Sequence, residues 1–150
     1  MKISRGRRFK SCRERFVNMN ILFVCKHNRF RSKIAEAILK SLKCKNIEVK
    51  SAGLRKDLIR PYVCENVKIV LKQRGINKID EAAREINDVD LRWADRIIIV
   101  ADNVSADIFP KEKTEIWKIG DADESEIEKI KMIAGDIERK VKELVKRVNI

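Results

Sequence analysis

The sequence has few of the residues that build metal sites or disulfide frameworks. It contains four cysteines and one histidine in 150 residues, and no two cysteines stand in a CxxC pair. This spacing argues against a zinc site, a thioredoxin-like motif and a disulfide-stabilised fold. The longest purely apolar runs, such as 21–25 and 97–101, are far shorter than the ~20 residues that span a bilayer. We therefore expect a soluble, cytoplasmic domain with no membrane segment and no requirement for a metal or other cofactor.

Positive charge is concentrated at the start of the chain. Residues 1–18 hold seven basic residues and one acidic residue, so they carry half of the formal net charge of +12. We expect 1–18 to be a disordered basic extension, with Met19 as an alternative start, and 19–150 to form one domain. A transit peptide or a nucleic-acid-binding arm would have a similar composition. Aromatic residues make up only 5% of the chain, which argues against nucleic-acid recognition.

From residue 19 onward, short apolar runs alternate with segments of helical periodicity. The apolar runs predict four strands, over 20–25, 46–51, 96–101 and 114–119. The periodic segments predict helices over 32–43, 61–74, 87–94, 103–109 and 124–148. Ser32 is placed to cap the first helix, and Pro61 suits the first turn of the second.

Such an alternation is typical of an α/β fold in which crossover helices connect parallel strands. We expect a single-domain, doubly wound, four-stranded parallel sheet with helices on both faces. Ligands of these folds bind beyond the carboxyl ends of the strands, at the point where the strand order reverses. The loop after the first strand is therefore the place to look for chemistry.

That loop combines a cysteine with cations and the start of a helix. Five residues separate Cys25 from Arg31, and Ser32 follows directly. Successive N–H groups of such a loop can form an anion site, and the helix adds its positive end. The guanidinium of Arg31 can bind two oxygens of a tetrahedral anion. A thiol in that field is expected to ionise readily and act as a nucleophile, although a lone cysteine at a strand end is more often a core residue.

We expect the whole loop to surround a phosphate-like anion, with the binding residues Lys26, His27, Asn28, Arg29, Phe30, Arg31 and Ser32. Lys26 and Arg29 are interpreted as rim charges that attract anions to the pocket. His27 is either a hydrogen-bonding brace or a proton-transfer group.

Further motifs follow in order along the chain. Ala35-Glu36-Ala37 lies in the first predicted helix, Ser51-Ala52-Gly53 closes the second strand, and 117–121 reads Trp-Lys-Ile-Gly-Asp. Together with the Cys25…Arg31-Ser32 loop, these motifs resemble the low-molecular-weight protein tyrosine phosphatases and the related arsenate reductases. The resemblance covers about residues 19–148.

The resemblance implies a role for several residues that match the family's motifs. Cys25 would be the nucleophile that forms a phosphocysteine intermediate, and Arg31 would stabilise the transferring phosphoryl group. Ser32 would donate a hydrogen bond to the thiolate, and Asn28 would brace the loop. Asp121 would be the general acid, although Ala122 replaces the usual proline and Asp123 is a competing candidate.

Some positions depart from the phosphatase pattern. The His27-Asn28 variant looks more like the arsenate reductase branch, but 101–110 contains no cysteine to act as a thiol relay. Cys44 and Cys64, the other cysteines of the body, are interpreted as core residues at helix positions or helix ends, so a reductase would need an external thiol. The run 122–125 is Ala-Asp-Glu-Ser, where phosphotyrosine-specific relatives often carry aromatics. Arg29 would repel a phosphoarginine substrate.

The leading hypothesis is a cysteine-dependent, metal-independent phosphomonoester hydrolase, with Cys25, Arg31 and Asp121 as its catalytic residues. Its partner would be a phosphorylated protein or a small phosphomonoester. The alternatives are an arsenate reductase that uses an external thiol, and a non-catalytic protein that binds anions or nucleic acid. The oligomeric state is left open by the sequence.

Overall fold

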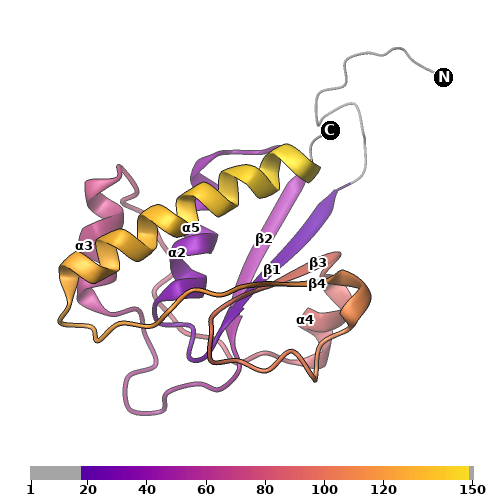
Figure 1. The fold of residues 1–150 in the computed structure, drawn as a ribbon, viewed down its shortest axis with the longest axis horizontal. Helices are drawn as coiled ribbons and strands as arrows, with labels where there is room; N and C mark the ends of the chain where they lie inside the picture. Colours follow the sequence, from indigo (N-terminus) through magenta and orange to yellow (C-terminus); the bar gives the residue numbers. More distant parts are fainter. Residues whose placement is uncertain (1–17, 149–150) are drawn as a thin grey trace.

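The computed structural model of the protein describes residues 18–148; the basic extension expected over 1–18 therefore lies outside the described residues, apart from Asn18. Four strands form one parallel sheet in the order β2-β1-β3-β4 (Figure 1). They are β1 (Met19–Cys25), β2 (Ile47–Gly53), β3 (Arg96–Val100) and β4 (Thr114–Trp117). The predicted α/β architecture is confirmed, and β1 lies at its centre with β2 on one side and β3 on the other.

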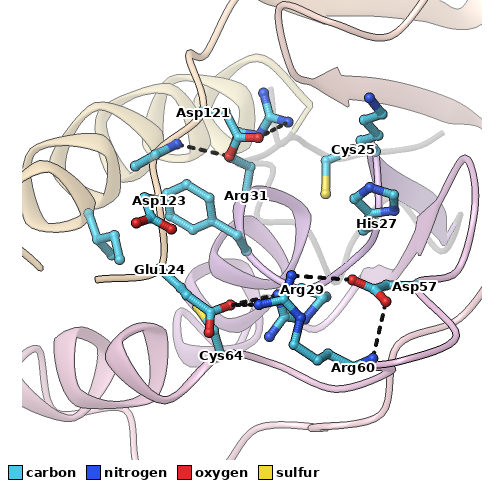
Figure 2. A pocket seen from close by; sticks show the side chains of 14 residues that line it. Cys25, His27, Arg29, Arg31, Asp57, Arg60, Cys64, Asp121, Asp123 and Glu124 are labelled. Atoms are coloured by element: carbon cyan, nitrogen blue, oxygen red, sulfur yellow. Dashed lines mark hydrogen bonds and ion pairs between the residues drawn. The ribbon is translucent and has the colours of Figure 1, made fainter. Parts of the chain in front are cut away.

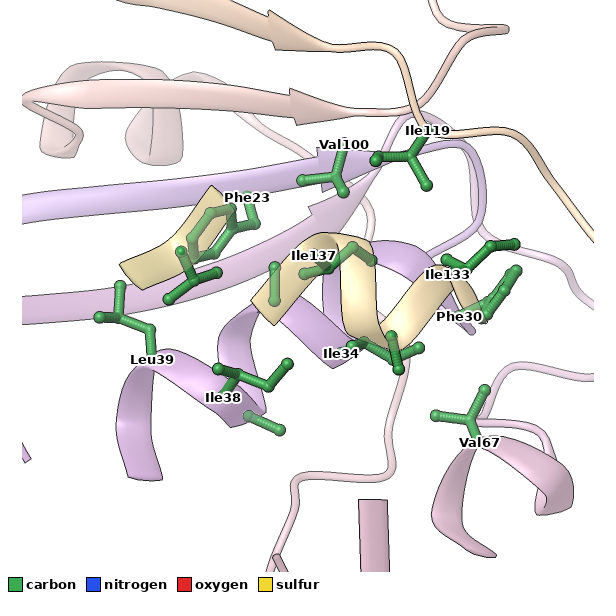
Figure 3. Packing of buried hydrophobic residues seen from close by; sticks show 14 of the residues in the cluster. Phe23, Phe30, Ile34, Ile38, Leu39, Val67, Val100, Ile119, Ile133 and Ile137 are labelled. Carbon is green, nitrogen blue, oxygen red and sulfur yellow. The ribbon is translucent and has the colours of Figure 1, made fainter. Parts of the chain in front are cut away.

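Three helices cover one face of the sheet: α2 (Arg31–Ser41), α3 (Glu65–Gln73) and α5 (Ile127–Val148). The apolar stripe of α5 packs against α2 and α3, and its Ile133 and Ile137 belong to one buried cluster with Ile34 of α2 and Phe23 of the sheet (Figure 3). Burial of these aliphatic side chains supplies most of the stabilisation of this layer. It also fixes the start of α2 against the end of β1.

The opposite face is covered by α4 (Asp88–Trp93) and the segment 101–110. Helix α4 begins with a capping box in which the Asn87 side chain accepts from the Asp90 N–H and Asp90 reciprocates. Val104 and Phe109 bury their side chains against Leu22 and Ile99 of the sheet. Helices thus lie on both faces, as predicted. None of the helices in the described part of the chain is long and apolar enough to cross a membrane.

Segment 103–109 is not the helix that its composition predicts. Turns and bends occupy 102–109, and the Ser105 hydroxyl accepts from the Asp107 N–H. Local side-chain acceptors of this kind compete with helical hydrogen bonds. Asn103 is also held by a distant partner, since its amide oxygen accepts from Arg31.

The other differences concern where helices begin. Pro61 does not open a helix, because 61–63 pairs with 81–83 through the Val63 N–H to the Glu81 oxygen and the Ala83 N–H to the Pro61 oxygen; α3 starts at Glu65. Likewise, α5 starts at Ile127, since 123–126 forms a turn.

Ser32 does not cap α2. The helix begins at Arg31 with Phe30 at the N-cap and no side-chain cap, and the Ser32 hydroxyl is directed instead at the loop before the helix.

Candidate active site

Cys25 is the last residue of β1, and the loop 26–30 leads directly into α2. The thiol side chain is buried, and its Sγ lies 3.0 Å from the Oγ of Ser32. Both flanking strands hydrogen-bond β1, so the cysteine cannot shift without disturbing the sheet. This arrangement holds the sulfur beside a hydroxyl that can donate to a thiolate, at the positive end of an 11-residue helix.

Asn28 holds the loop in its bent conformation. Its φ of 59° is in the left-handed region, which asparagine tolerates better than most residues. The Nδ2 donates to the Oγ of Ser32 at 2.7 Å and to the Oγ of Ser51 at 2.9 Å, while Oδ1 accepts from the Arg84 N–H. The side chain is completely buried. Asn28, the predicted brace of the loop, therefore forms side-chain hydrogen bonds to three neighbouring segments at once.

Gly53, at the end of β2, allows the loop to lie directly against the sheet. A Cβ at this position would stand 2.7 Å from the carbonyl carbon of His27 and 2.9 Å from the nitrogen of Asn28. Both are backbone atoms, which have little freedom to move. Glycine is thus required at the end of the Ser-Ala-Gly motif by close approach of the loop.

Behind the loop, a buried polar chain continues into α2. The Ser51 hydroxyl donates to Glu36 at 2.6 Å, and the same carboxylate accepts from Lys40 at 2.9 Å. Lys33 lies 3.9 Å from Glu36, and its burial lowers the pKa of its ammonium group although the neighbouring carboxylate opposes this effect. Ser51 is thereby oriented by a charged group, and it in turn orients Asn28.

Arg31 is almost completely buried, with 2% of its side chain exposed. Its Nη1 donates to the main-chain oxygen of Ile119 at 2.8 Å, and its Nη2 donates to Asn103 at 3.0 Å. The carboxylates of Asp102 and Asp121 lie 3.5 and 3.6 Å from the guanidinium. Figure 2 shows the guanidinium beside Asp121, with Cys25 lining the same pocket. Asp102 and Asn103 were not predicted from sequence.

Asp121 and Asp123 both line the pocket, but their partners differ. The Oδ2 of Asp121 faces Arg31 at 3.6 Å, and its Oδ1 accepts from the Ala122 N–H. Asp123 instead accepts from the Ser125 hydroxyl within the turn that precedes α5. The geometry therefore favours Asp121 over Asp123 as the carboxyl group next to a bound anion.

Arg29, interpreted from the sequence as a rim charge, lines the pocket and is paired with an acidic residue. Only 12% of its side chain is exposed, and its Nη1 lies 2.9 Å from the Oε2 of Glu124. The same oxygen accepts from Arg60 at 3.0 Å, and Arg60 also pairs with Asp57 at 3.7 Å. Figure 2 shows these four charged residues together at the lower edge of the pocket. Glu124 therefore offsets part of the charge by which Arg29 is expected to repel a phosphoarginine guanidinium.

The remaining loop residues take three different places. Lys26 is exposed at the pocket, and Phe30 packs into the core beneath it, so that Phe30 can contribute only its main chain to an anion site. The Nδ1 of His27 lies 3.1 Å from the Arg55 carbonyl oxygen, which fits the hydrogen-bonding brace.

Cys64 is a buried core residue at a helix end, as the sequence predicts, and it also lines the pocket, which the sequence did not indicate. It is the N-cap of α3, and its N–H donates to the Arg29 carbonyl oxygen. Burial raises the pKa of its thiol, although the N–H of Val67 and the charge of Arg29 oppose the shift. The pocket that both thiols line encloses about 220 Å³, below the ~300–1,000 Å³ typical of sites for drug-sized ligands. In residues 18–148, no group of three or more His, Cys, Asp or Glu side chains is arranged to hold a metal ion.

Known proteins share both the sequence pattern and the fold. The family model for low molecular weight phosphotyrosine protein phosphatases matches residues 20–150. The glutaredoxin arsenate reductase of Synechocystis sp. is 24% identical over 132 residues, which are 86% of this chain and 98% of that protein.

Two solved structures illustrate the range of activities among similar proteins. An arsenate reductase from Archaeoglobus fulgidus is 32% identical, with a TM-score of 0.70, and the match covers 84% of this chain and 98% of that one. The YwlE arginine phosphatase from Geobacillus stearothermophilus is 25% identical, with a TM-score of 0.74 and coverage of 87% and 92%. The chain therefore belongs to the low molecular weight phosphotyrosine protein phosphatase family, which includes phosphatases and arsenate reductases.

Proposed function

We propose that this protein is a cysteine-dependent phosphomonoester hydrolase that works through a phosphocysteine intermediate. The observation that carries the proposal is the contact between Cys25 and Ser32, in a pocket also lined by Arg31 and Asp121. Nucleophile, anion-binding cation and carboxyl group thus meet in one small cavity. This combination suits phosphoryl transfer, in which positioning and charge stabilisation do most of the work.

In the first step, the Cys25 thiolate attacks phosphorus while the bond to the leaving oxygen breaks. Asp121, in its protonated form, gives its proton to that oxygen, so the product leaves as a neutral alcohol or phenol. The sulfur–phosphorus bond replaces the oxygen–phosphorus bond. The guanidinium of Arg31 and the N–H groups of the loop balance the charge on the equatorial oxygens.

In the second step, water attacks the phosphocysteine and the sulfur–phosphorus bond breaks. The Asp121 carboxylate now accepts a proton from this water, so the same group acts as acid and then as base. Ser32 stabilises the departing Cys25 thiolate by hydrogen bonding, and inorganic phosphate is released. Arg31 and the loop amides supply the positive field at both steps, and the proposal includes no metal ion.

The substrate would be a phosphorylated protein or a small phosphomonoester, and we place the reaction in the cytoplasm. A reducing compartment keeps a catalytic thiol in its active form. The residues after Asp121 do not form an aromatic slot, so we do not restrict the leaving group to tyrosine. Since Glu124 balances Arg29, phosphoarginine belongs in the panel of substrates to be compared.

Hydrolysis of p-nitrophenyl phosphate in the presence of EDTA tests this function. We expect turnover that Cys25→Ser abolishes and that vanadate inhibits, with Cys44→Ser as a matched control that keeps its activity. Hydrolysis that persists in Cys25→Ser would contradict the mechanism. A panel of phosphotyrosine, phosphoserine, phosphoarginine and metabolite phosphomonoesters then ranks the leaving groups.

An arsenate reductase using an external thiol is the second candidate. The charged edge formed by Arg29, Glu124 and Arg60 favours it, because such an edge suits a small inorganic oxyanion better than an aromatic ring. Here the Cys25 thiolate would form a bond to arsenic, and two equivalents of a thiol such as glutathione would supply the electrons. Arsenate and two thiols would yield arsenite, a disulfide and water. Arsenite release above a Cys25→Ser blank supports this activity, and its absence removes it.

A further inference from the structure

Two arginines of residues 25–32, which we call the anion loop, contact the two ends of the segment that carries Asp121. We call residues 118–126, between β4 and α5, the acid loop. At its beginning, the main-chain oxygen of Ile119 accepts from Arg31 at 2.8 Å. Near its end, the carboxylate of Glu124 accepts from Arg29 at 2.9 Å. Residues 29 and 31 therefore connect the nucleophile's loop to both sides of the candidate acid.

Glu124 has more partners outside its own segment than any other side chain of this loop. Its Oε2 also accepts from Arg60 at 3.0 Å, and its main-chain oxygen accepts from the Nδ2 of Asn66 at 2.7 Å. Asp57 lies 3.7 Å from Arg60 and keeps that guanidinium in the cluster. The acid loop is thus attached at one residue to the anion loop, to the 54–64 segment and to α3.

Asp121 has no comparable anchor of its own. Its side chain is 54% exposed, and its contact with Arg31 is 3.6 Å long. Among residues 18–148, it accepts a hydrogen bond only from the adjacent Ala122 N–H. The position of its carboxyl group consequently depends on how the backbone is held on either side. A displacement of about 1 Å in such a group can cost on the order of a hundredfold in rate.

We propose that Glu124 is a positioning residue, and that its bridge to Arg29 and Arg60 fixes the acid loop so that Asp121 protonates the leaving group. This inference rests on the proposed phosphatase function. The bridge is ionic on both sides and its Arg29 side chain is largely buried, so it is stronger than an exposed ion pair. Glu124 itself touches no reacting atom in this account.

The test compares Glu124→Gln with Glu128→Gln. Glu128 is a matched control because it is the same residue type four positions further along, in the first turn of α5, and is 82% exposed. In the described part of the chain it pairs only with Lys131. Arg60→Gln serves as a second variant that removes one of the two arginines while Glu124 keeps Arg29. Hydrogen exchange of 118–126 is measured without ligand, so this readout does not depend on activity. We expect exchange about tenfold faster in Glu124→Gln, less in Arg60→Gln and unchanged in Glu128→Gln.

The kinetic readout uses two aryl phosphates that differ in leaving-group quality. General acid catalysis matters most when the leaving group is poor. We therefore expect the kcat/KM of Glu124→Gln for phenyl phosphate to fall about tenfold further than that for p-nitrophenyl phosphate. Vanadate inhibition should stay within about twofold of wild type, because the anion loop keeps its own contacts.

Each outcome decides a separate point. Unchanged exchange in Glu124→Gln overturns the positioning role, even if the wild-type protein hydrolyses no phosphate ester. An equal loss with both leaving groups, or a loss of vanadate binding that parallels the loss of activity, overturns it as well. A wild-type protein with no hydrolysis of either ester contradicts the proposed function, while the exchange comparison still decides whether Glu124 fixes the acid loop.

Discussion

The Oγ of Ser32 lies 3.0 Å from the Sγ of Cys25, although six residues separate the two in the sequence. Asn28 donates to the same hydroxyl at 2.7 Å, which leaves the hydroxyl proton free to point at the sulfur. A hydroxyl oriented in this way stabilises a thiolate both before attack and after the sulfur–phosphorus bond breaks.

Ser32→Ala should therefore reduce kcat on p-nitrophenyl phosphate by about tenfold to a hundredfold, because one preorganised hydrogen bond to the developing charge is lost. Vanadate inhibition should change much less, since Arg31 and the loop amides remain. Steady-state kinetics with a vanadate titration check this. A variant with wild-type kcat would show that the Ser32 hydroxyl does not act on the sulfur.

Asp121→Asn and Asp123→Asn separate the two acid candidates. Asp121 faces Arg31, whereas Asp123 accepts from Ser125 in the turn before α5. We expect Asp121→Asn to lower kcat by about 10²–10⁴, the range for loss of a general acid, and Asp123→Asn to lower it by less than about tenfold. The reverse ranking would assign the acid to Asp123.

Gly53→Ala should displace the anion loop, because the loop backbone lies directly against Gly53. Its Cβ would lie 2.7 Å from the His27 carbonyl carbon, so the loop must shift. We expect a loss of about 1–3 kcal/mol in the free energy of unfolding, together with weaker vanadate binding. Gly135→Ala in α5 is the control, because the nearest atom to its Cβ is a flexible Arg74 nitrogen at 3.5 Å. Alanine in a helix interior should add about 0.5–1 kcal/mol there. Unfolding in urea and vanadate titration measure both effects.

The strands were predictable because β1 and β3 are continuous apolar runs, buried on both faces. The helix expected over 103–109 and the helix start expected at Pro61 were wrong for a shared physical reason. In both places, hydrogen bonds to distant segments outweigh local propensity: Asn103 contacts Arg31, and Pro61 contacts Ala83.

The candidate site was predictable only where it is local in sequence. Cys25, Asn28 and Ser32 lie within eight residues of one another, so their spacing carries the information. Glu124 was visible as one of the residues replacing aromatics, but its contact with Arg29 spans 95 residues. Pairing over that distance depends on how α5 docks on the sheet. The available signal in the sequence was a charged residue, Glu124, close to the candidate acid and at a position where phosphotyrosine-specific relatives often carry aromatics.

Lys33 gives a prediction about pH and stability. Burial lowers the pKa of its ammonium group below the usual 10.5, which means that the charged form is less favourable in the folded protein than in the unfolded chain, where water solvates it. As pH rises through the lowered pKa toward 10.5, the folded state releases this proton first, and the lysine's contribution to the free energy of unfolding increases.

Lys33→Met should therefore be more stable than wild type at pH 7, and this advantage should shrink as pH approaches 10.5. Urea unfolding of both proteins under reducing conditions, at a series of pH values, measures the difference. The comparison cancels the other groups that titrate in the same range. A difference that stays constant across the series would contradict the assignment of a buried charge to Lys33.

The most direct test of the central claim is chemical trapping of the phosphorylated enzyme. Asp121→Asn is mixed with p-nitrophenyl phosphate, quenched in acid within the first turnover and mapped by peptide mass spectrometry. We expect one phosphate on the sulfur of the peptide that contains Cys25, and none on the same peptide from a sample prepared without substrate. Release of p-nitrophenol with no phosphate on Cys25, or with phosphate on another residue, would contradict it.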